Sequence, residues 1–168
     1  MNIAFILLGI SFLSLGWYIV KEISQTGAKI GGWLLILSSF GNLLSGFFNT
    51  DPAGTISEKM TLSGQIHGAA AGLLGFMILA TMFIFWQFIK QQGFKPFNKP
   101  ILISTILVWT TEISLISAMG VYLSKTNGML TPETPIGWFG RLVIICCAVW
   151  VIVCATTLGK IENIKVDK

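Results

Sequence analysis

Five long apolar runs follow one another along the chain, separated by short segments that carry most of its lysines and prolines. They cover approximately residues 3–20, 30–48, 66–89, 101–123 and 136–158. Each is close to the length of about 20 residues that a helix needs to cross about 30 Å of hydrocarbon. Because backbone polar groups inside lipid must be satisfied within their own segment, each run is predicted to be a helix. The pattern predicts an all-α integral membrane bundle with five transmembrane helices.

Composition supports a single transmembrane domain over residues 1–168, with a polar tail at 159–168. Apolar residues make up 54% of the chain and charged residues 11%, whereas a soluble domain has about a quarter of its residues charged. This balance excludes an ordinary soluble globule and a disordered chain. The first run has no basic leading region and no small-residue cleavage site, so we expect a membrane helix there and not a signal peptide.

The distribution of lysines predicts the orientation in the membrane. Segments 21–29, 90–99 and 160–168 hold two, three and three lysines, and the alternate loops hold only Lys59 and Lys125. By the positive-inside rule the richer segments face the cytoplasm, with the N-terminus outside and the C-terminus inside a prokaryotic cell membrane. The net charge of +4 therefore reflects topology. No basic patch interleaved with aromatic residues predicts nucleic acid, so the expected partner is the lipid bilayer, with homo-oligomer assembly left open.

The three cysteines, Cys146, Cys147 and Cys154, all lie inside the last apolar run. They form no C-x-x-C pair, and the single histidine of the chain lies far away in sequence. Small, soft side chains of this kind usually fill space in an apolar core. We therefore expect packing residues, no metal site and no cofactor.

Two stripes of residues at helical spacing predict how the helices pack. Gly64, Gly68 and Gly72 are four residues apart, and small residues on one face let another helix approach closely in lipid. The partner helix can belong to this chain, which we favour, or to a second copy. The second run carries Ser38, Asn42, Ser45 and Asn49 on one face, which should point inward. This polar stripe either forms interhelical hydrogen bonds, each adding about 0.6 kcal/mol, or lines a polar cavity.

Four ionisable residues from separate segments fall in the predicted outer half of the bundle: Asp51, His67, Glu112 and Arg141. Glu112 is about 15 Å from the outer end of its run, where a carboxylate is costly unless paired or protonated. An intramembrane ionisable residue is a functional-site hypothesis by default. The structural alternative is an ion pair between Glu112 and Arg141, with His67 bonded to a loop.

Short motifs add a family resemblance. The segment LSGFFNTDPAG at 44–54 is followed by Ile66-His67-Gly68, and GWFGRL at 137–142 leads into a helix that carries Trp150. Together they resemble the uncharacterised bacterial and archaeal membrane proteins known as domain of unknown function 998. The resemblance covers most of the chain and implies a six-helix bundle in which Asp51, His67 and Arg141 occupy motif positions. It implies no activity.

The chain departs from that family pattern in three ways. Asn49 stands where the family usually has proline, and Gly140 stands where it has an acidic residue that would neighbour Arg141. The family's first helix has no counterpart before the first run, so the five runs correspond to its last five. The outside N-terminus would follow from that difference.

Three classes of function stay open. The first is a binding or sensing protein for a small ligand or lipid headgroup, with an outward-facing pocket lined by Asp51, His67, Glu112 and Arg141 and walled by Asn42 and Ser45. The second is a small proton-coupled transporter that works as an oligomer; the lack of an internal repeat and of a broken helix argues against it. The third is an enzyme acting on lipid-type substrates, with no nucleophile or metal set to support it.

Overall fold

The computed structural model describes all of the chain except residues 1, 53, 91–94, 96, 127–134 and 167–168. The described regular structure is entirely helical, as predicted. Its elements are α1 (Asn2–Glu22), α2 (Thr26–Phe47), the 3₁₀ turn η1 (Ser57–Lys59), α3 (Leu62–Leu73), α4 (Phe76–Lys90), α5 (Asn98–Lys125) and α6 (Ile136–Val166). α6 continues through most of the segment that was expected as a polar tail.

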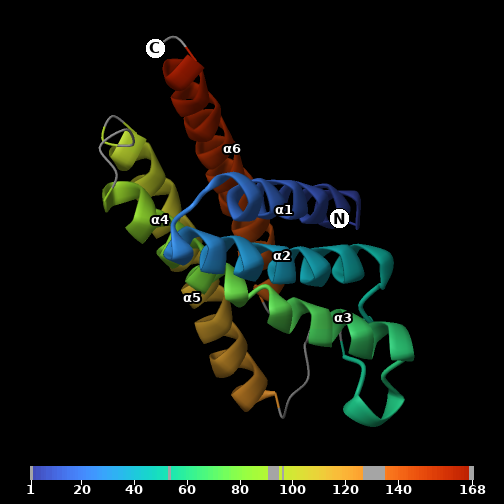
Figure 1. The fold of residues 1–168 in the computed structure, drawn as a ribbon. Helices are drawn as coiled ribbons and strands as arrows, with labels where there is room; N and C mark the ends of the chain where they lie inside the picture. The colour runs from blue at the N-terminus through green and yellow to red at the C-terminus, as the bar shows by residue number, and fades with distance from the viewer. Residues whose placement is uncertain (1, 53, 91–94, 96, 127–134, 167–168) are drawn as a thin grey trace.

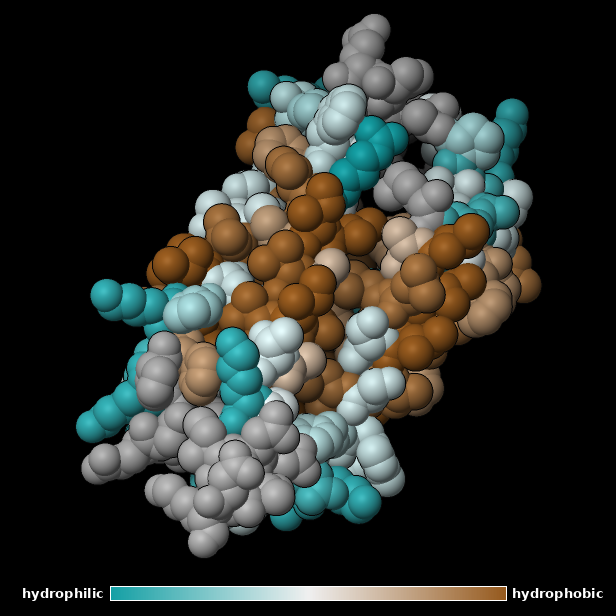
Figure 2. Space-filling model, turned by 90° about the horizontal axis from the view of Figure 1, so that it is seen from above, coloured by the Kyte–Doolittle hydropathy of each residue, from teal (hydrophilic) through white to brown (hydrophobic). Residues whose placement is uncertain are grey.

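Five stretches are long and apolar enough to cross a membrane: α1, α2, α3 with α4, α5, and α6 as far as Lys160. The predicted number of membrane-spanning segments is therefore confirmed. Apolar side chains form a broad middle band of the surface, and hydrophilic groups gather toward two opposite ends (Figure 2). This band is the surface that lipid tails would cover.

α1 and α2 form an antiparallel pair, the most extensive in the fold (Figure 1). Glycines bring the two backbones together: a Cβ added at Gly16 would lie 2.8 Å from the carbonyl oxygen of Gly32. A Cβ at Gly9 would lie 2.8 Å from the side chain of Leu43. Helices in lipid associate through such small residues because no hydrophobic effect drives them together there.

The opposite side of α2 packs against α3 and α4, so that α2 lies between two layers. Gly41 faces the carbonyl oxygen of Ala70 in α3, and Gly31 faces that of Ala80 in α4. Contacted on both sides, α2 buries more of its length than the other membrane-spanning helices described. This position explains why a polar stripe on α2 can be kept away from lipid.

The run at 66–89, which was expected to be one helix, is interrupted at Leu74 and Gly75. The N–H groups of residues 74, 75, 77 and 78 donate to carbonyl oxygens three residues earlier, where an α-helix would use the fourth. On α2, the Ser38 hydroxyl donates to the carbonyl oxygen of Leu73 at 3.3 Å. Backbone groups at a helix interruption in a membrane need such partners. The run therefore forms one membrane-spanning stretch that is built from α3 and α4.

α5 and α6 form the second helix pair and cross the α1–α2 pair steeply (Figure 1). The indole N–H of Trp150 in α6 donates to the Thr105 hydroxyl in α5 at 3.0 Å. The indole N–H of Trp109 in α5 donates to the Thr81 hydroxyl in α4 at 2.8 Å. These two bonds join α5 to α4 on one side and to α6 on the other.

The glycine stripe of α3 does not make the contact within the chain that we favoured. Gly64 is buried, but a Cβ there would overlap the Asp51 carboxylate of the preceding connection, not a helix. Gly68 and Gly72 are exposed, and a Cβ on either would meet nothing within 4 Å. The reason is rotational: α3 turns Ala70 toward α2. Packing of this face against a second copy stays a prediction.

Candidate functional site

The polar stripe of α2 points into the bundle, as predicted. Ser38 and Asn42 are fully buried and Ser45 is 1% exposed, whereas Asn49 lies beyond the helix end and is exposed. The side-chain amide of Asn42 donates to the Ser38 carbonyl oxygen at 3.2 Å. Asn42 Oδ1 and Ser45 Oγ are buried without a hydrogen-bond partner among the described residues. Orphaned buried polar atoms are rare in native proteins, so this pair needs an explanation.

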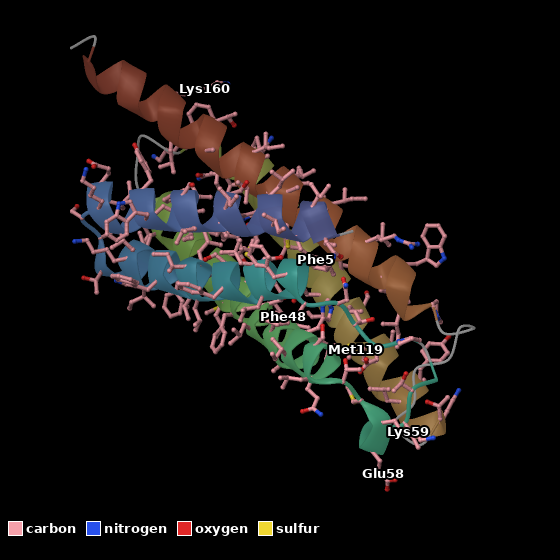
Figure 3. The ribbon with its side chains drawn as sticks, turned by 90° about the vertical axis from the view of Figure 1, so that its right-hand side faces the viewer. Phe5, Phe48, Glu58, Lys59, Met119 and Lys160 are labelled. Carbon is pink, nitrogen blue, oxygen red and sulfur yellow. The ribbon has the colours of Figure 1, made fainter. Side chains whose placement is uncertain are left out.

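His67 projects from α3 toward the C-terminal end of α2. Its Nδ1 lies 2.8 Å from the carbonyl oxygen of Phe48, and its ring meets that of Phe5 edge to face, with centroids 6.0 Å apart. Figure 3 labels Phe5 and Phe48 at this junction of α1 and α2. Because a carbonyl oxygen only accepts, Nδ1 carries the hydrogen and neutral His67 presents Nε2 as its acceptor. Protonation converts Nε2 to a donor and leaves the Phe48 bond in place.

Asp51 fixes the start of α3. Its carboxylate accepts hydrogen bonds from the backbone N–H of Thr61 at 2.9 Å and from the Thr61 hydroxyl at 2.7 Å. Thr61 is the N-cap of α3 and accepts from the Gly64 N–H at 3.1 Å. Alongside, the Ser63 hydroxyl donates to the Asn49 carbonyl oxygen. A negative charge is favourable at a helix N-terminus, so Asp51 stabilises the closed connection between α2 and α3.

Glu112 lies on the buried face of α5, one turn beyond Val108. Its side chain is 4% exposed, and Oε1 has no hydrogen-bond partner among the described residues. At 1.5 Å per residue it is roughly 20 Å from either end of α5. On α6, which packs against α5, Cys147 is also buried, with 3% of its surface exposed. An ionisable group at the centre of a membrane helix costs about 3 kcal/mol, which makes an unpartnered one a strong functional candidate.

Arg141 does not pair with Glu112. It is exposed, and its guanidinium lies over the ring of Trp138, 4.8 Å from the centroid. The ion pair found among the described residues joins two neighbours, Lys21 and Glu22. The reason is helical phase: α6 turns Cys147 toward the core, and Arg141, about 1.7 turns earlier, falls on another face. The predicted structural alternative, a Glu112–Arg141 ion pair, is therefore wrong.

The predicted site residues occupy separate surroundings. Asp51 and His67 both fasten the α2–α3 connection, Asn42 and Ser45 lie on the buried face of α2, and Glu112 lies in the core facing α6. No hydrogen bond or ion pair in the described part of the chain joins Glu112 to the others. The described residues also contain no group of three or more His, Cys, Asp or Glu side chains that could hold a metal ion. One pocket shared by all six residues stays a prediction.

Sequence reasoning missed the grooves on the surface of the bundle. A groove of about 470 Å³ between α1 and α6 is lined in part by Ser11, Ser14 and Tyr18, and a neighbouring one of about 290 Å³ shares Ser11. A third, of about 380 Å³ between α5 and α6, has Lys99 at one end. None of these three is lined by the predicted site residues. Grooves depend on how far two helices diverge, which residue spacing does not report.

The comparisons with known proteins agree with the motif resemblance. Residues 1–157 match a family model described as "Protein of unknown function (DUF998)". Neither the curated proteins nor the solved structures contain a match to the chain. The matched range includes Asn42, Ser45, Asp51, His67, Glu112 and Arg141.

Proposed function

The chain belongs to the DUF998 family, and we propose that it is a membrane protein that binds a small ligand inside its helical bundle through the carboxyl group of Glu112. The observation that carries the proposal is the burial of this carboxyl, with Oε1 unpartnered among the described residues. A carboxyl group offers at least one acceptor oxygen whether it is ionised or protonated. The ligand class that fits is therefore a cation or a molecule with N–H or O–H donors.

The outer end of the bundle supplies a sensing element in this proposal. In this role His67 offers Nε2, which is an acceptor in the neutral ring and a donor in the protonated ring. Asp51 acts by holding α3, on which His67 sits, and does not itself contact the ligand. Arg141, exposed beside Trp138, is suited to hold an anionic solute or lipid headgroup at the surface.

The test is native mass spectrometry of the gently solubilised protein. The wild type is compared with Glu112→Gln, which keeps the side-chain volume, and with Glu58→Gln, a control at the exposed η1 turn. We expect a small bound mass on the wild type and the control, and its loss from Glu112→Gln. A bound mass retained by Glu112→Gln, or a bare wild-type protein, would reject Glu112 as the binding group.

One observation favours a second candidate, a small proton-coupled carrier that works as an oligomer. Carriers place their sites beside discontinuous membrane helices, and α3 and α4 are such a pair, interrupted at Leu74 and Gly75. The buried carboxyl of Glu112 would then carry the proton. We expect wild-type proteoliposomes to take up labelled methylammonium or choline in response to a proton gradient, and Glu112→Gln proteoliposomes to lose that response. Equal uptake by both would exclude this candidate.

The enzyme alternative gains no support from the geometry. A lipid-directed acid–base pair would use Asp51 and His67. The Asp51 carboxylate is engaged by Thr61, and the His67 Nδ1 by Phe48. Both interactions stabilise the α2–α3 connection, and no hydrogen bond between the two side chains is found in the described part of the chain. We therefore do not assign them a catalytic role.

A further inference from the structure

A groove runs along α5 and α6 on the outside of the bundle, at the end opposite the α2–α3 connection. Its walls are Ile103, Ser104 and Leu107 of α5 with Val149 and Val153 of α6, and it encloses about 380 Å³. At one end the wall is completed by Lys99 and Pro100. Apolar grooves of this kind on a membrane-facing surface can take a hydrocarbon chain.

Both walls of the groove lead to a lysine at the same end. On α5, Lys99, Ile103 and Leu107 are four residues apart and share one face. On α6, Lys160 follows Val153 by seven residues, again on one face. Figure 3 shows Lys160 at the far end of the molecule from Glu58 and Lys59.

Lys160 is held close to the start of α5. Its Nζ lies over the ring of Phe97, 5.7 Å from the centroid, and Lys99 follows Phe97 by two residues. Lys90, also at this end, lies over the Trp86 ring at 4.6 Å. Aromatic rings and lysines arranged in this way belong at the headgroup level of a bilayer, where Lys99 and Lys160 put positive charge beside the mouth of the groove.

We propose that this groove binds an anionic phospholipid, with an acyl chain between α5 and α6 and the phosphate at Lys99 and Lys160. Charge complementarity selects the occupant: Lys99 completes one end of a groove whose walls are otherwise mostly apolar, and Lys160 lies over Phe97 at the same end of the bundle. The lipid comes from the leaflet at this end of the bundle, which the distribution of lysines predicts to be cytoplasmic. The site is separate from Glu112, and the lipid proposal does not depend on the function proposed above.

The experiment uses the full chain purified in detergent and mixed with equal amounts of phosphatidylglycerol and phosphatidylcholine that carry the same acyl chains. Native mass spectrometry counts the lipids that stay bound. The test variant is Lys99→Gln with Lys160→Gln, which removes both charges from exposed side chains. Its matched control is Lys125→Gln, an exposed lysine at the other end of α5. Val153→Trp tests the groove separately, because it fills the space and leaves both lysines in place.

We expect the wild type and the control to retain phosphatidylglycerol preferentially. Each lost lysine should weaken that preference about five-fold, and Val153→Trp should lower retention of both lipids. An unchanged preference in the double variant would overturn the proposal, as would equal retention of the two lipids by the wild type. Displacement by an equal concentration of glycerol 3-phosphate would also overturn it, because the site would then bind free phosphate. A dimer that excludes lipid from the groove would show that a second copy is the occupant instead.

Discussion

Replacing Glu112 by leucine should make the protein more stable, although it removes the residue to which we assign ligand binding. Leucine is slightly larger than glutamate, so the change leaves no cavity. The change removes a buried polar group whose Oε1 has no partner among the described residues. Leaving such a group unpaired costs about 1–3 kcal/mol. We therefore expect Glu112→Leu to raise the free energy of unfolding by about that amount, with a rise of several degrees in Tm.

Three variants measured side by side separate the causes. Thermal unfolding in detergent, followed by tryptophan fluorescence, compares Glu112→Leu with Glu112→Gln and with Thr110→Leu. Thr110 is exposed and its hydroxyl bonds only within its own helix turn, so Thr110→Leu controls for added hydrophobicity on α5. We expect Glu112→Gln to stay near the wild type, because glutamine keeps buried polar atoms. If Glu112→Leu and Glu112→Gln both lower Tm, the carboxyl has a structural partner, and the hypothesis that Glu112 is an unpartnered binding group is refuted.

The helix packing and the α2–α3 connection allow three further predictions. Gly16→Ala should destabilise the α1–α2 pair by about 1–3 kcal/mol through overpacking. Gly72 faces open space, so Gly72→Ala should stabilise α3 by about 0.5–1 kcal/mol. Thermal unfolding measures both variants, and equal effects on Tm would contradict the described packing of the two glycines. Asp51→Ala removes the acceptor that holds Thr61, the N-cap of α3. It should cost about 1 kcal/mol and speed hydrogen exchange in the first turn of α3, and unchanged exchange would contradict this role of Asp51. Neutral His67 should give the ¹⁵N signals of an Nδ1–H ring in nanodiscs, and an Nε2–H ring would exclude its bond to Phe48.

The membrane-spanning elements could be predicted because lipid leaves the backbone few options. The interruption at Leu74 and Gly75 could not, because no proline marks it and glycine also occurs in continuous membrane helices. What distinguishes this place is a neighbour: the Ser38 hydroxyl of α2 is positioned to bond the Leu73 carbonyl oxygen. A tertiary contact of this kind leaves no signal in the local sequence.

The sequence predicts which polar side chains of the candidate site are buried, but not which side chains they contact. The inward faces of Asn42, Ser45 and Glu112 follow from helical spacing and the cost of polar groups in lipid. Whether Arg141 can pair with Glu112 depends on how α6 is rotated, and depth alone suggested that it would. Arg141 and Cys147 are six residues apart, which is not a whole number of helical turns, so they lie on different faces of α6. This spacing could have argued against an ion pair between Arg141 and Glu112.

Replacing Glu112 by leucine should raise the stability of the fold and abolish ligand binding. These two opposite effects, measured together, would be the strongest support for a binding role of Glu112. A residue kept for structure stabilises the fold, so replacing it lowers stability. A residue kept for binding can be costly to the fold, and replacing it then raises stability while binding is lost. Asn42 and Ser45 carry two more orphaned oxygens in the core, so the same opposition can be tested on α2. Ser45→Ala removes one orphaned oxygen without adding volume and should also raise Tm; if it alters the bound mass as Glu112→Gln does, both helices contribute to one ligand site. If it raises Tm and leaves the bound mass unchanged, the ligand site is confined to α5 and its direct neighbours.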